Sequence, residues 1–259
     1  MIIINKLNSS FCLFVRPFSY LNPYRKKIMN FLQQIADLSG FSVCHQLPER
    51  SMLLGNIYMP VCCRCSGIYI GFFLSIVILF LMHKKRQSDM PPLYIIIISC
   101  FFIVSTFADG LLSYLGIYET NNIIRMITGY LSGSGIAVII YPIFIFQYYR
   151  VSERIKIFET YQFYIFFIIT TINAIIIQVL LLLLKPAFFA LFFYYFNFFC
   201  IIFTFWFSNL ALSLLIPHFS QKAEKLFGKN LIFPLLLSAV LSFVELFSSY
   251  RLHIWIQRF

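Results

Sequence analysis

The sequence is poor in charged residues. Only 11% of its 259 residues are charged and only 9 are acidic, whereas 61% are hydrophobic. A soluble domain usually has about 25% charged and about 45–50% apolar residues. A water-soluble fold of this length cannot bury so much apolar surface, which excludes a cytosolic enzyme, a disordered protein and a small disulfide-rich domain. We therefore expect an all-α integral membrane protein.

Motifs for several common chemistries are also missing. The chain has no glycine-rich phosphate-binding loop, no dinucleotide fingerprint, no nucleophile elbow and no H-E-x-x-H sequence. No internal repeat suggests the inverted halves of a transporter. Any functional residues must therefore be sought outside these motifs.

Long apolar runs dominate the remaining sequence. A membrane-spanning helix needs about 20 apolar residues, because the hydrocarbon core is about 30 Å thick. Six runs meet this requirement: 65–82, 90–108 with an apolar continuation to Leu115, 126–149, 160–184, 186–216 and 230–250. The runs do not alternate strictly, so a transmembrane barrel is disfavoured. We predict a polytopic bundle of about six spans, with a very short turn at Lys185 and Pro186.

Residues 1–43 form a basic segment before the first motif. Apolar residues at helical spacing predict an amphipathic helix in the membrane interface, with basic residues at the lipid headgroups. The apolar positions are Ile28, Phe31, Leu32, Ile35 and Leu38, and the basic ones are Arg25, Lys26 and Lys27. A frayed basic tail is the alternative. The rest divides into a motif-bearing core of three spans, 44–149, and three further spans, 150–259.

Charge bias between the spans predicts the orientation. Three alternate loops are basic, through Lys84, Lys85 and Arg86, then Arg150, Arg154 and Lys156, then Lys222, Lys225 and Lys229. The positive-inside rule places these loops in the cytoplasm and both termini outside the cell membrane, the inner membrane of a bacterium. The basic N-terminal segment disagrees, since it would have to be translocated. The net charge of +11 then marks loops that face anionic lipid headgroups, and no nucleic-acid partner is expected.

Potential metal ligands are concentrated just before and within the first span. Four of the seven cysteines and one of the four histidines lie between positions 44 and 65. Thiolates and imidazole are the ligands that zinc prefers, and they also suit iron or copper. The predicted ligands of zinc or another transition metal are Cys44, His45, Cys62 and Cys65. A disulfide or redox pair and inert packing are the alternatives.

A second group of polar residues is predicted on the same membrane face. Asp109 lies near the end of the second span, where a carboxylate is costly and needs a partner. Arg125, near the start of the third span, is the expected partner. The pair could fix helix packing, relay protons, or lie beside a metal; alternatively, arginines could clamp an anion or lipid phosphate. The predicted polar cluster is Arg50, Arg64, Asp109, Asn122 and Arg125, with Glu245 as a possible further member.

Small residues at a spacing of four occur in two of the spans. Gly67 and Gly71 lie just inside the first span, and Gly129 and Gly133 just inside the third. This spacing lets helix backbones approach closely. If the two grooves meet, Cys65 and Arg125 are brought to neighbouring positions at one depth.

These residues carry a resemblance to a known family. The pattern C-H-x-x-P-x-R-S occurs at 44–51, P-x-C-x-R-C-[ST]-G-I-Y-x-G at 60–71, D-G at 109–110 and N-x-x-R-x-x-T-G at 122–129. It resembles that of an uncharacterised prokaryotic membrane-protein family, domain of unknown function 2085, over residues 44–142. Cys63 falls on a variable position and is left out of the ligand set. The family has no established activity, but the resemblance implies that these polar residues form one unit.

Three functional hypotheses follow from these residues. The first is a membrane protein with a metal- or thiol-based site of Cys and His residues beside the polar cluster. The second is a membrane enzyme acting on a lipid or a thiol, with Asp109 as acid or base and arginines holding phosphate. The third is a non-catalytic scaffold with a structural disulfide or zinc ion.

Overall fold

A computed structural model describes residues 31–54, 57–83, 87–117, 120–150, 153–156, 160–183, 187–221 and 232–256. Within these ranges the chain is an all-α bundle, as predicted. Six helices are long and apolar enough to cross a membrane. They are α4 (Cys63–Met82), α5 (Leu93–Tyr114), α6 (Asn122–Tyr148), α7 (Thr160–Leu183), α8 (Ala187–Ser213) and α9 (Ile232–Ile256).

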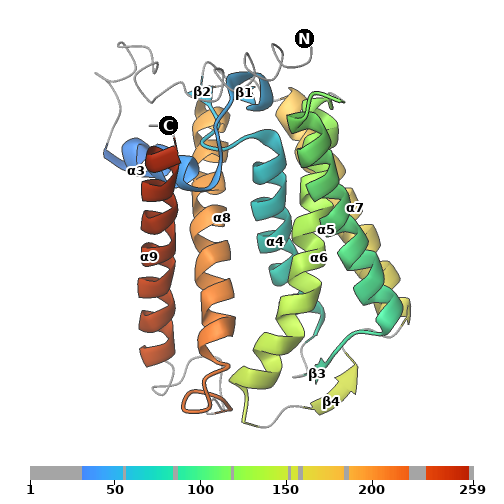
Figure 1. Ribbon diagram of the computed structural model, residues 1–259. Coiled ribbons are helices and arrows are strands. Elements are labelled where there is room, and N and C mark those ends of the chain that lie inside the picture. The colour runs from blue at the N-terminus through green and yellow to red at the C-terminus, as the bar shows by residue number, and fades with distance from the viewer. Residues whose placement is uncertain are drawn as a thin grey trace.

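The six long helices run side by side, with α4 and α6 at the centre of the bundle (Figure 1). Helices α8 and α9 lie on one side of this pair, and α5 and α7 lie on the other. The start of α4, the end of α5 and the start of α6 share one end of the bundle, as the alternating direction of the spans predicts. The predicted turn at Lys185 and Pro186 lies outside the described residues.

The predicted close contact between two glycine pairs is confirmed, and it explains the central position of α4 and α6. A Cβ atom added at Gly67 would lie 2.3 Å from the carbonyl oxygen of Met126, and one at Gly71 would lie 2.3 Å from that of Tyr130. In return, a Cβ atom at Gly133 would lie 2.1 Å from the carbonyl oxygen of Ile68. Only glycine lets the two backbones approach this closely.

A short helix, α3 (Phe31–Val43), lies across the end of α8 and α9 (Figure 1). The hydroxyl of Tyr194 on α8 donates a hydrogen bond of 2.6 Å to the buried carboxylate of Asp37. Leu32 and Leu38 are exposed, as expected for a helix whose apolar side faces the membrane interface. The helix predicted near the N-terminus is therefore confirmed from Phe31, while Ile28, Arg25, Lys26 and Lys27 lie outside the described residues.

One two-stranded sheet lies at each end of the bundle. Strands β1 (Leu53–Leu54) and β2 (Ile57–Tyr58) form an antiparallel pair beside the start of α4. A 3-10 turn, η2 (Pro48–Arg50), precedes them. At the opposite end, β3 (Gln87–Asp89) pairs in parallel with β4 (Glu153–Lys156). The segment between α3 and α4 therefore folds back over one end of the bundle, where the candidate site lies.

Candidate metal or thiol site

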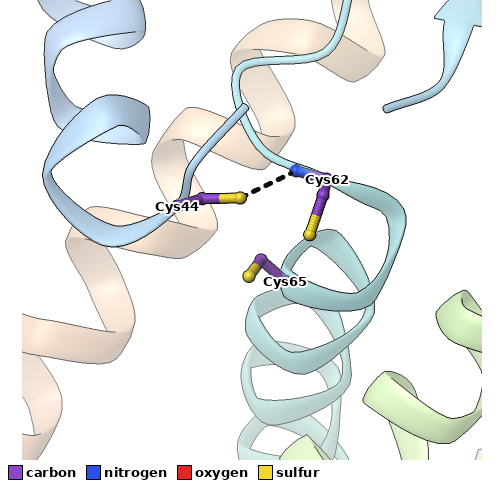
Figure 2. Close-up of side chains that lie close together, drawn as sticks. All are labelled: Cys44, Cys62 and Cys65. Carbon is purple, nitrogen blue, oxygen red and sulfur yellow. Dashed lines mark hydrogen bonds between the residues drawn. The ribbon is translucent and has the colours of Figure 1, made fainter. Parts of the chain in front are cut away.

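Three of the four predicted ligands come together at the start of α4. The Sγ atoms of Cys44, Cys62 and Cys65 all lie within 4.8 Å of one another. Figure 2 shows that Cys44 approaches from the end of α3, while Cys62 and Cys65 lie on the first turn of α4. Cys44 is buried, and the other two are half-buried. Among the described cysteines, none forms a disulfide bond, and this includes Cys44, Cys62 and Cys65.

Local backbone contacts hold Cys44 beside Cys62. The backbone N–H of Cys62, the residue that caps the N-terminus of α4, donates a hydrogen bond of 3.3 Å to the Sγ of Cys44. Gln46 closes the base of the loop, because its Nε2 donates to the carbonyl oxygens of Asp37 at 3.0 Å and Pro60 at 2.7 Å. Gly40 allows α3 to lie close to the backbone of Pro60, because a Cβ atom at position 40 would lie 2.0 Å from the Pro60 carbonyl oxygen. Sequence reasoning missed the positioning roles of Gln46 and Gly40.

The three sulfur atoms have different electrostatic environments. Hydrogen bonds from the thiols of Cys44 and Cys65 hold the pKa of Cys62 well below its usual value. The same interaction with Cys62 raises the pKa of Cys44 to about 12. Both neighbouring thiols and the helix dipole therefore favour negative charge on the Cys62 sulfur at this helix N-terminus. A thiolate is the form of cysteine that binds metals and attacks disulfides.

His45 is not part of this group of three. Its side chain is exposed, and its ring lies against that of His253 on α9, with centroids 5.3 Å apart. Partial burial, followed by the nearby His253, lowers the pKa of His45. Gln46, directly after it, has a positive φ of 53°. This turn sends the chain in a direction that sequence spacing alone does not reveal.

Cys63 lies outside the sulfur group, in agreement with its exclusion from the predicted ligand set. Its side chain is 1% exposed and packs with Met126 and Tyr130 of α6. Cys62 and Cys65 instead lie near Ile201 and Phe205 of α8. The two faces of the first turn of α4 therefore have different neighbours.

The predicted ion pair between Asp109 and Arg125 is wrong. Asp109 pairs instead with Arg64 of α4, whose Nε donates to Oδ2 at 3.0 Å and whose Nη2 contacts the same oxygen. The two side chains are only 11% and 14% exposed, respectively. The other carboxylate oxygen, Oδ1, is buried and has no hydrogen-bond partner among the described residues. Arg64 and Arg125 both lie near this end of the bundle, but within the described residues only Arg64 forms an ion pair with Asp109.

Arg125 instead forms hydrogen bonds to neutral groups. Its Nε donates to Thr120 Oγ1 at 3.0 Å, its Nη1 to Asn122 Oδ1 at 3.1 Å, and its Nη2 to Ser113 Oγ at 3.2 Å. Arg50 donates to the carbonyl oxygen of the same Ser113 at 3.2 Å. The polar cluster therefore includes the five residues predicted, together with Ser113 and Thr120, which sequence reasoning missed.

Glu245 is separate from this polar cluster. Its carboxylate accepts a hydrogen bond of 2.9 Å from Nδ2 of Asn209, which links α9 to α8. Asn209 also donates to Ser242 at 3.1 Å. Glu245 therefore takes part in the contact between α8 and α9.

The sulfur group and the polar cluster lie at the same end of the bundle but on different sides of α4. Arg64 reaches toward α5, whereas Cys65 packs toward α8. Together they define a helical membrane protein with a three-cysteine group beside a network of arginines.

Comparison with known proteins places this architecture in a family. Residues 44–140 match the family described as "Predicted membrane protein (DUF2085)". The chain is 35% identical to an uncharacterized protein of Methanothermobacter thermautotrophicus over 97 residues, which are 38% of this chain and 83% of that protein. It is 32% identical to an uncharacterized protein of Methanocaldococcus jannaschii over 108 residues, 42% of this chain and 67% of that one. The chain belongs to this family, and no solved structure matches it.

Proposed function

We propose that this membrane protein binds a soft transition metal, zinc foremost, through Cys44, Cys62 and Cys65. The observation that carries this proposal is the separation of the three Sγ atoms, which are all within 4.8 Å. Sulfur ligands of a tetrahedral zinc ion, with Zn–S bonds of about 2.3 Å, are about 3.8 Å apart. Modest side-chain rotations bring the group to that geometry. One sulfur is already favoured as a thiolate, the form that metal binding requires.

His45 is the proposed fourth ligand. It is adjacent to Cys44 in the chain, and its side chain is exposed. Metal-bound histidines usually donate their other ring nitrogen to a neighbouring acceptor. His253, whose ring already contacts that of His45, lies where it would orient the bound imidazole.

The same geometry supports a second candidate, a redox pair of Cys62 and Cys65. A C-x-x-C pair at a helix N-terminus with one stabilised thiolate is the arrangement of thiol–disulfide exchange sites. Oxidation would join the two Sγ atoms and pass two electrons and two protons to a disulfide of a partner molecule. A metal and a disulfide compete for the same sulfur atoms, so one experiment distinguishes them.

The test is elemental analysis with a thiol count on full-length protein purified in detergent. We expect about one zinc per chain, with Cys44, Cys62 and Cys65 shielded from thiol reagents until a chelator is added. Cys62→Ser should lose the metal while remaining monodisperse. Cys63→Ser is the matched control, since it removes the adjacent sulfur that faces α6, and it should keep the metal.

Two results would contradict metal binding. Protein that takes up no zinc, iron or copper after reduction and reconstitution would overturn it, and so would equal metal loss in the Cys62 and Cys63 variants. Two fewer free thiols, restored by a reductant and abolished in Cys65→Ser, would instead establish the redox pair.

We also propose that the site faces the outside of the cell membrane. The support is the positive charge of the loops at the opposite end, where Arg150 follows α6. Anionic lipid headgroups are the proposed partners of those loops. A membrane-impermeant thiol reagent that labels metal-free Cys62 in intact cells supports this orientation, and labelling only after lysis contradicts it.

A further inference from the structure

Three arginines surround the last turns of α5. Asp109 and Ser113 are four residues apart on this helix, so they lie on one face, one turn from each other. Arg64 binds Asp109, while Arg50 and Arg125 both bind Ser113. The guanidinium groups therefore come from three separate segments, η2, α4 and α6.

Among the residues that the structure describes, the charges of this cluster do not balance. Asp109 is neutralised by Arg64 in the ion pair. Within the described residues, the hydrogen-bond partners of Arg50 and Arg125 are hydroxyl, amide and carbonyl oxygens, and no carboxylate there forms an ion pair with either arginine. The backbone carbonyl of Glu49, beside Arg50, accepts a hydrogen bond of 3.3 Å from Asn122. Two positive charges thus remain without a counter-charge within the described part of the chain.

This imbalance is costly for Arg125, which is 6% exposed. A buried charge without a counterion destabilises a fold, because the charge loses its hydration and gains no ion pair in return. Three of its five N–H groups are used, on Thr120, Asn122 and Ser113. Within the described part of the chain, its remaining donors, and those of the half-buried Arg50 that do not bind Ser113, are available to a further acceptor. The N-terminus of α6 begins at Asn122 and adds positive potential at the same place.

We propose that Arg50 and Arg125 hold a phosphate-type oxyanion at this end of the bundle. Guanidinium groups bind phosphate through paired, charge-assisted hydrogen bonds, and two of them supply the charge that a phosphate carries. The side chains of Ser113 and Asn122 orient Arg125, and the backbone carbonyl of Ser113 orients Arg50. The source of the anion is either a phospholipid headgroup or free phosphate in the adjacent water. This site stands on the arginine network and is independent of metal binding by the cysteines.

The experiment uses the full-length protein in phosphatidylcholine nanodiscs. In one arm, inorganic phosphate is added against chloride at equal ionic strength, and the melting temperature is followed. In the other, the nanodiscs contain phosphatidylglycerol, and lipid retained by the protein is measured by native mass spectrometry. A rise in melting temperature that saturates with phosphate identifies the soluble source, and selective retention of phosphatidylglycerol identifies the lipid source.

Three variants distinguish anion binding at this site from a general effect of surface charge. Arg50→Gln should weaken anion binding about tenfold or more, because it removes one charged partner. Arg125→Lys should weaken it similarly, since lysine keeps the charge but loses the planar fork. Arg251→Gln is the matched control: it removes one exposed arginine near the end of α9, at the same end of the bundle.

The proposal fails in either of two cases. One is that neither phosphate nor phosphatidylglycerol binds the wild-type protein more tightly than Arg50→Gln. The other is that Arg251→Gln weakens binding as much as Arg50→Gln does. If an Arg125 variant fails to fold, the half-buried Arg50 and its matched control still decide the outcome.

Discussion

The two halves of the bundle are held together in different ways. Helices α4 and α6 meet through glycines that bring backbone against backbone, and Ser75 donates a hydrogen bond of 2.8 Å to Ser134 across the same contact. Helix α8 meets α4 mainly through aromatic rings, such as Phe73 and Phe203 with centroids 5.0 Å apart. In an apolar stretch of 18 residues within α6, 67% of the residues are buried, compared with 17% in such a stretch of α9.

The difference shows where the architecture is least tolerant of change. Lipid chains are as apolar as phenylalanine, so close backbone packing and hydrogen bonds specify helix contacts in a membrane more strictly than apolar area does. The family match, residues 44–140, covers α4, α5 and most of α6 and ends before α7. We infer that the glycine contact fixes the part of the protein that carries both polar groups, while the aromatic helices pack around it.

A substitution at the glycine contact should have the largest effect on stability. In Gly133→Ala, the new Cβ would lie 2.1 Å from the carbonyl oxygen of Ile68. The helices must separate, and we expect a loss of about 3 kcal/mol or more in the free energy of unfolding. Denaturant unfolding in detergent measures it. Gly110→Ala is the control, because its nearest neighbour would be Arg64 Nη1 at an ordinary 3.5 Å. Equal stability of the two variants would refute the backbone contact.

Breaking the ion pair should have the next largest effect. Asp109→Asn leaves Arg64 without a counter-charge at a site where both side chains are nearly buried, and should cost about 2 kcal/mol or more. The double variant Asp109→Asn/Arg64→Gln should recover most of this loss. Glu245→Gln, in the C-terminal half, keeps an oxygen that can accept from Asn209 and should cost less than about 1 kcal/mol. A double variant as unstable as the sum of its single changes would argue against the pair.

An aromatic substitution should have the smallest effect of the three. Phe73 packs against Phe196, Phe199 and Phe203 of α8. Phe73→Leu keeps most of the apolar volume and loses the edge-to-face ring contacts, so we expect a loss of about 1 kcal/mol. The same unfolding assay measures it. A loss as large as that of Gly133→Ala would mean that the aromatic contact is as strict as the glycine contact.

Several features were correctly predicted because they follow from local or periodic constraints. The six spans follow from the thickness of the bilayer, although α4 begins at Cys63 rather than Cys65 and α9 continues to Ile256 rather than Tyr250. The glycine contact follows from the spacing of small residues on two helices. The meeting of Cys62 with Cys65 follows from their positions on one helical turn.

The partner of Asp109 could not be chosen in the same way. Arg64 and Arg125 both lie near the correct end of their helices, so counting residues along the spans leaves both within reach. The rotation of α4, set by Gly67 against α6, directs Arg64 toward α5. Arg125 instead donates hydrogen bonds to Thr120, Asn122 and Ser113. The direction of His45 likewise depends on the turn at Gln46, which no periodic pattern encodes.

Amino-acid composition, span length and small-residue spacing were sufficient to establish a six-helix membrane bundle, and the cysteine and arginine motifs indicated the end that carries the polar groups. These properties depend on the thickness of the bilayer and on helical periodicity, which constrain every membrane-spanning helix in the same way. The choice of ion-pair partner, the grouping of three sulfurs without His45, and the hydrogen bonds that bring Arg50 and Arg125 to Ser113 emerged only in the folded bundle. They depend on how each helix is rotated and how the loop between α3 and α4 closes, and both are set by contacts between residues far apart in the chain.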